Sequence, residues 1–109
     1  MNDSKQASIS FPRGFRAAGV SAGLKKSGKK DVALVVSDRP AAVAAVFTQN
    51  LMAAAPVIVA RETVAQGRAR AIIVNSGVAN ACTGAEGVAD ARATIAHVAE
   101  RLGCAANEV

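Results

Sequence analysis

The first part of the chain alternates short apolar runs with charged or glycine-containing turns, a pattern typical of β-strands. Residues 14–23 alternate loosely and contain three glycines, which favours a strand or a close backbone approach. After a charged turn at residues 25–30, the β-branched run at residues 32–36 predicts a buried strand. A second apolar run covers residues 41–48. Because residues 38–40 read Asp-Arg-Pro, we predict a turn there and a hairpin between the two runs.

The hydrophobic period changes after residue 52. Residues 53–66 carry apolar positions at helical spacing, with Pro56 in the first turn and Gly67 as a stop, and they predict a helix. Residues 69–74 are apolar apart from Arg70 and too few for a helix, so we predict a central strand. This strand ends in Asn-Ser-Gly at residues 75–77, which is a turn signal.

The end of the chain carries the clearest helix pattern. Residues 83–86 match a capping box, and Asp90 adds negative charge near the start. Gly103 follows the last apolar position and predicts the end of the helix. The predicted order is therefore strand, strand, strand, helix, strand, helix, in an α+β fold. The apolar positions of this last helix are Val88, Ala91, Ile95, Val98 and Leu102.

Composition indicates a globular chain with a weak core. The 109 residues are 51% hydrophobic and 19% charged, which excludes the low hydrophobicity of disordered proteins. Aromatic residues make up only 3%, with no Trp or Tyr, so packing has to rely on Ala and Val. Small side chains bury little area each, and apolar stabilisation scales with area. We therefore expect this chain to fold against a partner surface.

The net charge of +5 is unevenly distributed, since residues 1–30 carry +6. A basic segment can bind nucleic acid or a phosphate-bearing cofactor, but this one holds only Phe11 and Phe15 for stacking and no nucleic-acid motif. The alternative is a solvated hairpin turn preceded by a loose start. We favour the second interpretation, with residues 1–13 as a flexible N-terminal arm and no nucleic-acid partner.

The sequence predicts a cytoplasmic protein with no membrane segment and no metal site. Residues 1–10 are polar and no apolar h-region follows, and no apolar run approaches the roughly 18 residues of a spanning helix. Cys82 and Cys104 lack metal-ligand spacing to each other or to His97. We expect Cys82 to be buried and inert, His97 to be exposed, and Cys104 to be a small packing residue.

The segment 74–84, which joins a predicted strand to a predicted helix, is dense in small polar groups. Such a loop can hold a substrate, because the strand end fixes its position and the helix N-terminus offers free N–H groups. It can equally be an ordinary turn with side-chain caps. The spacing of dinucleotide-binding or phosphate-binding loops is absent. The candidate substrate residues are Asn75, Ser76, Asn80 and Thr83.

Several of these segments together resemble one family, the ornithine acetyltransferases, also called the ArgJ family of arginine biosynthesis. The decisive motif is NSG-x-ANACTG at residues 75–84, followed by a helix that begins with Glu86. Where this family usually has asparagine, this chain has Val78. The likeness runs from Gly14 to the end of the chain, through GFRAAGVSAGLK, DVALVVSD, AAVAAVFTQN, AAPVIVARE and ARAIIVNSGVANACTGAEGVADAR.

The resemblance implies a longer precursor that cuts itself at a threonine, which becomes the N-terminal nucleophile of a second chain. Such enzymes are glutamate N-acetyltransferases that move an acetyl group from N-acetylornithine to glutamate. Some of them also accept acetyl-CoA, and no other cofactor is implied. The fold implied is a layered α/β/β/α sandwich of the ArgJ/DmpA kind. Implied partners are the C-terminal remainder or β chain, assembled into an oligomer of α–β pairs.

The resemblance places the catalytic groups outside the printed sequence. A Thr-Gly pair that stabilises the oxyanion is expected shortly after Val109, and the nucleophilic threonine beyond it, so no catalytic residue is assigned here. Residues 14–109 are then an incomplete N-terminal segment of this fold, inactive alone. The alternatives are a binding module or truncated pseudoenzyme that uses the basic arm, and a subunit of a split enzyme.

Overall fold

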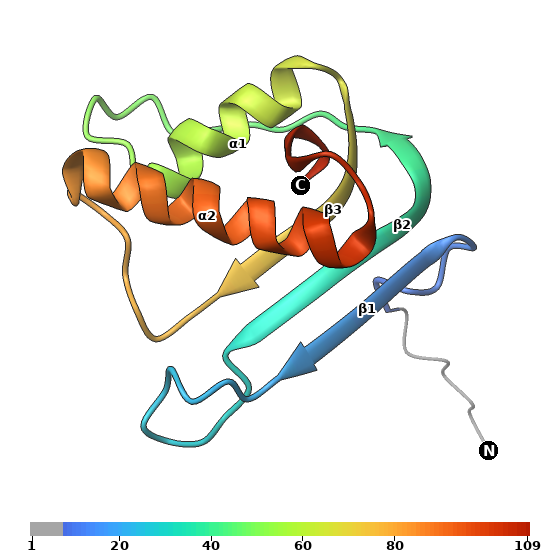
Figure 1. The fold of residues 1–109 in the computed structure, drawn as a ribbon, viewed down its shortest axis with the longest axis horizontal. Helices are drawn as coiled ribbons and strands as arrows, with labels where there is room; N and C mark the ends of the chain where they lie inside the picture. The colour runs from blue at the N-terminus through green and yellow to red at the C-terminus, as the bar shows by residue number, and fades with distance from the viewer. Residues whose placement is uncertain (1–7) are drawn as a thin grey trace.

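The computed structural model describes residues 8–109, which form a mixed α and β fold with helices stacked on a sheet (Figure 1). The α+β class predicted from the sequence is confirmed, with one strand fewer than expected. Residues 1–7 of the predicted N-terminal arm lie outside the described residues. The elements are β1 (Phe15–Val20), β2 (Val32–Ala42), α1 (Ala55–Ala65), β3 (Arg68–Asn75), α2 (Gly84–Leu102) and the 3-10 helix η1 (Ala106–Glu108).

The three strands form one antiparallel sheet in the order β1-β2-β3. In this register Val20 pairs with Val32, and Val32 pairs on its other side with Asn75. β2 is therefore the central strand. The prediction that residues 69–74 form a central strand was wrong in position, because β3 lies at an edge of the described sheet. Its apolar run instead reflects residues on both faces of that edge strand.

The predicted hairpin between residues 32–36 and 41–48 does not form. β2 continues through Pro40 to Ala42, with a shift in register between Val36 and Ala41. Proline has no N–H to donate to the neighbouring strand, so regular pairing is interrupted at Pro40. A β-bulge accommodates the unpaired residues, and the strand continues in the same direction. The sheet thus lacks the expected third strand at residues 41–48, and the rest of that segment has no regular structure.

Both predicted helices form close to their predicted ends. Pro56 lies in the first turn of α1, where its missing N–H breaks no helical hydrogen bond. α2 ends at Gly103, whose φ of 66° is left-handed and favours glycine. In residues 8–109, neither helix combines the length and hydrophobicity that a membrane crossing requires.

The helices cover one face of the sheet, and the core lies between them (Figure 1). Its centre is a cluster of buried Val36, Ala71, Ala99 and Val109. Among residues 8–109, no large side chain is fully buried. Packing therefore rests on Ala and Val, as the composition predicts. The partly buried residues around this centre are Leu34, Ile73, Ile95, Val98, Leu102 and Cys104.

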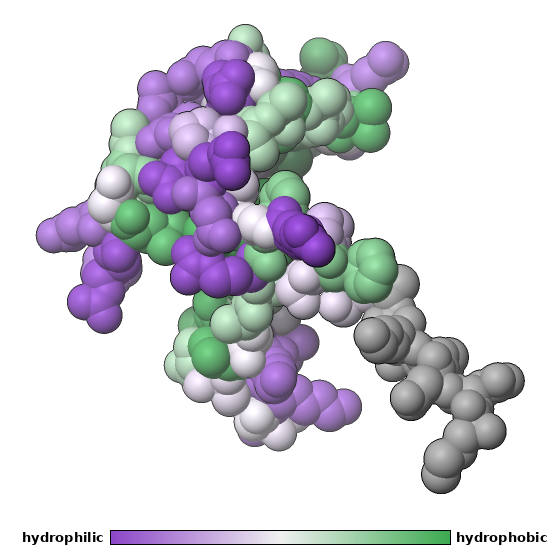
Figure 2. Space-filling view, turned by 90° about the vertical axis from the view of Figure 1, so that its right-hand side faces the viewer, coloured by the Kyte–Doolittle hydropathy of each residue, from purple (hydrophilic) through white to green (hydrophobic). Residues whose placement is uncertain are grey.

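The opposite face of the sheet is also apolar but is not covered by helices. Since side chains alternate along a strand, the residues next to the core positions point to this second face. Figure 2, which views the molecule from the right-hand side of Figure 1, shows hydrophobic side chains among hydrophilic ones at the surface. On the uncovered face of the sheet, Ile72 and Val74 of β3 are 57% and 52% exposed. We call this surface the open sheet face, and define it by Phe15, Ala17, Gly19, Ala33, Val35, Ile72 and Val74.

A substitution in the central strand tests where the core lies. We expect Val36→Ala to lower the free energy of unfolding by about 1 to 3 kcal/mol, because Val36 is 8% exposed and the removed methyl groups leave a cavity. The control is Val46→Ala, which removes the same groups from a residue that is 98% exposed and should change stability by less than about 0.5 kcal/mol. Urea denaturation of the 109-residue chain measures both, and equal effects would contradict this core.

Candidate functional site

The candidate substrate loop, residues 75–83, leaves the end of β3 and enters α2. Within it the Asn80 amide donates a hydrogen bond of 2.7 Å to the Gly87 carbonyl, and the Thr83 hydroxyl bonds the Asn80 side-chain oxygen. Thr83 occupies the N-cap position without a capping bond from its side chain to the helix. The predicted capping box is therefore wrong, because Asn80 takes the hydroxyl that would have capped α2.

Close packing against α2 fixes this arrangement. A Cβ atom on Gly87 would lie 1.7 Å from Thr83 Oγ1 and 2.3 Å from Asn80 Oδ1, so the loop can approach the helix only at a glycine. Gly87 is buried beneath these two side chains. The fold therefore brings Asn80 and Thr83 into contact with each other, and together they hold the loop against the first turns of α2.

Asn75 and Ser76 lie at the other end of the loop, where β3 stops. Asn75 pairs with Val32 in the sheet and is exposed. The backbone N–H of Ser76 donates to the carbonyl of Asp31 at 2.8 Å. The structure thus places the four candidate residues at the two ends of one loop, and their contact with a substrate stays a prediction.

A mainly apolar cavity of about 350 Å³ adjoins Asn75, between β3, the two helices and the segment that precedes α1. Its lining includes Val59 and Thr63 of α1 and Ile95 of α2. The Thr63 hydroxyl is already bound to the Val109 carbonyl at 3.1 Å. The cavity therefore offers space and hydrophobic contact, with few polar groups to orient a ligand.

Asp31 directly precedes β2, and its side chain accepts more hydrogen bonds than any other side chain near the loop. Its carboxylate accepts the backbone N–H groups of Ala22 at 2.6 Å, Leu24 at 2.7 Å and Lys25 at 2.9 Å. The residue is 4% exposed. The hydrogen bond from Ala22, then that from Lys25 and more weakly that from Leu24, lower the pKa of Asp31, against the opposing effect of burial. The carboxylate is therefore held in its ionised form.

Sequence reasoning missed this role of Asp31. The available signal was an acidic residue directly after a turn rich in Lys and Gly and directly before a buried strand. Aspartate at a turn commonly accepts nearby backbone N–H groups. Only the folded chain shows that it takes three at once.

The two reactive side chains considered from the sequence are both at the surface. Cys82 is exposed, so the prediction of a buried thiol was wrong. Its φ of 55° marks a turn just before α2, outside the faces that pack on the core. His97 is exposed on α2, as predicted, and Cys104 packs beside the core as predicted. Among residues 8–109 no three His, Cys, Asp or Glu side chains are grouped as metal ligands.

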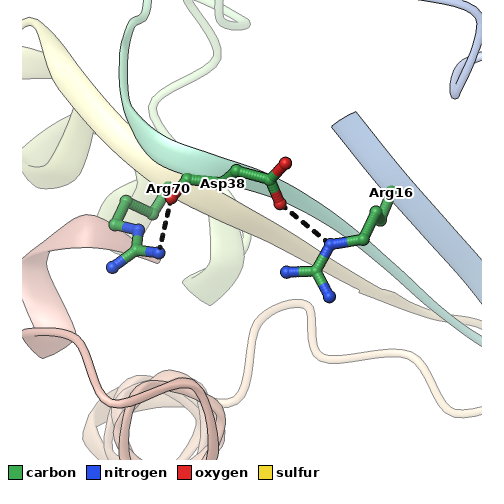
Figure 3. Close-up of polar contacts among 3 residues, drawn as sticks. All are labelled: Arg16, Asp38 and Arg70. Carbon is green, nitrogen blue, oxygen red and sulfur yellow. Dashed lines mark hydrogen bonds and ion pairs between the residues drawn. The ribbon is translucent and has the colours of Figure 1, made fainter. Parts of the chain in front are cut away.

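At the other end of the sheet, Asp38 links residues from all three strands (Figure 3). Its carboxylate binds Arg16 Nε at 2.9 Å, and its carbonyl accepts a hydrogen bond from Arg70 at 3.2 Å. Arg70 Nε is buried with no partner among the described residues. Both side chains of the Arg16–Asp38 pair are more than half exposed, so this ion pair contributes little to stability. Together with the Arg70 hydrogen bond, it connects β1 and β3 to the central strand.

Comparison with known proteins decides the family. A profile of the ArgJ family matches residues 16–109, which include all of the sheet except Phe15, both helices and the whole candidate loop. The chain belongs to the ArgJ family. Relatives named arginine biosynthesis bifunctional protein ArgJ are 52% identical in Thermobifida fusca and 54% identical in Geobacter sulfurreducens. These alignments cover 94% and 89% of this chain, but 27% and 25% of the relatives.

Solved ArgJ structures share the fold. An ornithine acetyltransferase from Mycobacterium tuberculosis, complexed with ornithine, matches with a TM-score of 0.88 and 50% identity, over 91% of this chain and 54% of that one. Arginine biosynthesis bifunctional protein ArgJ from Bacillus halodurans matches with a TM-score of 0.91 and 41% identity, over 96% and 55%. This ArgJ chain thus spans about a quarter of the length of its curated relatives.

The lowered pKa of Asp31 predicts acid sensitivity of this ArgJ chain. A carboxylate with a depressed folded pKa contributes stability that is complete above its unfolded pKa, about 3.9, and is lost as the pH falls through the lower folded value. The free energy of unfolding should therefore decrease as the pH falls below about 4. In Asp31→Asn this contribution is absent, and the difference from wild type should shrink with acidification. Urea denaturation between pH 2 and pH 7 measures it, and a constant difference would contradict the assignment.

Proposed function

We propose that the natural protein containing this chain is a glutamate N-acetyltransferase that moves an acetyl group from N-acetylornithine to glutamate in cytoplasmic arginine biosynthesis. The observation that carries the proposal is the family match over residues 16–109, which contains the complete NSGVANACTG loop. The names of the relatives and the ornithine complex of the Mycobacterium tuberculosis enzyme support the same class of reaction. Acetyl-CoA is a second proposed donor, and no other cofactor is proposed.

The described residues contribute a scaffold and a loop to this reaction, while other polypeptide contributes its chemistry. Acyl transfer needs a nucleophile, a base and donors for the oxyanion within one site. Cys82 is an exposed thiol in a turn, and His97 lies on the outer surface of α2. Residues 8–109 bring no such set together. The nucleophilic threonine and the Thr-Gly pair are accordingly proposed in residues beyond Val109.

The candidate loop is proposed to contact the substrate through its β3 end. Asn80 and Thr83 are engaged with each other and with α2, whereas the Asn75 side chain is exposed beside the apolar cavity. Asn75 and the Ser76 hydroxyl are therefore the better-placed candidates for polar contacts. Val78, 57% exposed between the two pairs, can give only an apolar contact.

We propose the remaining polypeptide of the same protein as the partner of the open sheet face. Two sheets that pack face to face share an apolar interface built from alternate residues of each strand, as this face presents. Its exposed Ile72 and Val74 are large enough to drive such packing. The result would be the α/β/β/α layering, and pairs of this kind are proposed to assemble further into an oligomer.

The proposed activity predicts a sharp difference between two purified proteins. The natural protein should release ornithine from N-acetylornithine when glutamate is present, with formation of N-acetylglutamate. Residues 1–109 alone should show no transfer above the uncatalysed rate, because the nucleophile and its oxyanion donors are missing. Mass spectrometry of the two amino acids and their acetyl derivatives measures this. Turnover by residues 1–109 alone, or none by the natural protein, would overturn the proposal.

A charge placed on the open sheet face tests the proposed partner. We expect Ile72→Lys to reduce association of this chain with the remaining polypeptide by about a hundredfold or more, because burying an unpaired ammonium group opposes packing. Ala93→Lys, on the exposed surface of α2, adds the same charge away from this face and should leave association unchanged. Co-purification of the two separately expressed pieces measures binding, and equal association by both variants would refute the interface.

A further inference from the structure

Two segments far apart in the sequence meet at one end of the sheet. The β1–β2 turn, residues 21–30, and the loop at residues 75–83 both leave the sheet at the lower left of Figure 1. The pairing of Val20 with Val32 and of Val32 with Asn75 requires this. Asp31 immediately precedes Val32 in the chain and lies between the two segments.

On the turn side, Asp31 acts through its carboxylate. One oxygen accepts the N–H of Ala22, and the other accepts the N–H groups of Leu24 and Lys25, at 2.6, 2.7 and 2.9 Å. Hydrogen bonds to an ionised acceptor are about twice as strong as neutral ones. The carboxylate therefore fixes the backbone of residues 22–25 in one conformation.

On the loop side, Asp31 acts through its backbone. Its carbonyl accepts the Ser76 N–H at 2.8 Å, while its own N–H donates to the carbonyl of Val20, at the end of β1, at 2.9 Å. The Ser76 bond is made just after β3 ends, where the loop begins. Asp31 thus binds both the turn and the first residue of the loop.

The turn that Asp31 fixes also packs directly on the loop. A Cβ atom on Gly77 would lie 2.8 Å from Lys25 Cγ and 3.3 Å from the Leu24 carbonyl carbon. Gly77 has a φ of 97°, which only glycine adopts readily. The backbone of the loop therefore rests against residues that Asp31 itself holds in place.

We infer that Asp31 is a positioning residue for acyl transfer: by clamping residues 22–25 and the Ser76 amide, it sets the place of the substrate loop at residues 75–83. The inference rests on the proposed function in so far as this loop contacts the substrate. The residue touches no reacting atom itself. Misplacement of a substrate-positioning group by about 1 Å can lower turnover by about a hundredfold, so loss of the contacts that hold this loop should slow the reaction.

Substitution at Asp31 in the natural protein that contains this chain tests the inference. Asp31→Asn keeps the size of the side chain but removes the charge and one of its two accepting oxygens. We expect kcat/KM for acetyl transfer to fall by roughly ten- to a hundredfold, together with faster hydrogen exchange at the Ser76 and Gly77 amides. Asp31→Glu restores the carboxylate on a longer stem and should recover part of both losses.

The matched control is Asp38→Asn, in the same strand and of the same chemistry. Asp38 binds Arg16 at the far end of the sheet and makes no contact with the loop, so this variant should keep wild-type kinetics and loop exchange. Thermal unfolding of both variants identifies any general loss of folding. The Gly77→Ala variant disturbs the same contact from the loop side. Combined with Asp31→Asn, it should lower kcat/KM less than the product of the two separate effects.

The outcomes separate this inference from the proposed function. Unchanged loop exchange in Asp31→Asn overturns the clamp, and faster exchange with wild-type kinetics in an active enzyme overturns its part in acyl transfer. Equal losses in Asp31→Asn and Asp38→Asn would show a general effect of the charge and also overturn it. If the wild-type natural protein performs no acetyl transfer, the proposed function fails, while hydrogen exchange still decides whether Asp31 holds the loop.

Discussion

The constraint on which the rest of this structure depends is a three-stranded sheet that is apolar on both faces but covered by helices on one. The covered face packs Val36 and Ala71 against Ala99 of α2 and against Val109, and these small side chains bury limited area. The open sheet face keeps Ile72 and Val74 at the surface. Hydrophobic stabilisation is proportional to the area removed from water, so further polypeptide against this face would add what the core lacks.

The same sheet determines where the candidate loop at residues 75–83 can lie. Antiparallel pairing brings the turn after β1, the start of β2 and the end of β3 to the same end of the sheet. There the Asp31 carboxylate accepts backbone N–H groups of the turn, and its carbonyl accepts the Ser76 N–H of the loop. Buried backbone groups require such partners. The hydrogen bond between Asn80 and Thr83 holds one end of the loop, and the bond from Ser76 to Asp31 holds the other.

Residues 8–109 form a scaffold without a catalytic set of side chains. The described residues supply a strand-to-helix loop, a cavity beside Asn75 and the open sheet face, all of which follow from packing and backbone hydrogen bonding. The exposed Cys82 and His97 show that reactive residue types by themselves do not make a site. A nucleophile needs a base and oxyanion donors placed with it, and residues 8–109 bring no such set together.

The sequence by itself determined the elements whose signals are local: the period of α2 with its Gly103 stop, the Pro56 start of α1 and the apolar runs of β2 and β3. It also determined the family, through residues 75–84. Tertiary structure decided what depends on partners distant in the chain. Pairing and packing, which no local pattern encodes, produced the bulge at Pro40 in β2 and the edge position of β3. They also directed the Thr83 hydroxyl to Asn80 and three backbone N–H groups to Asp31.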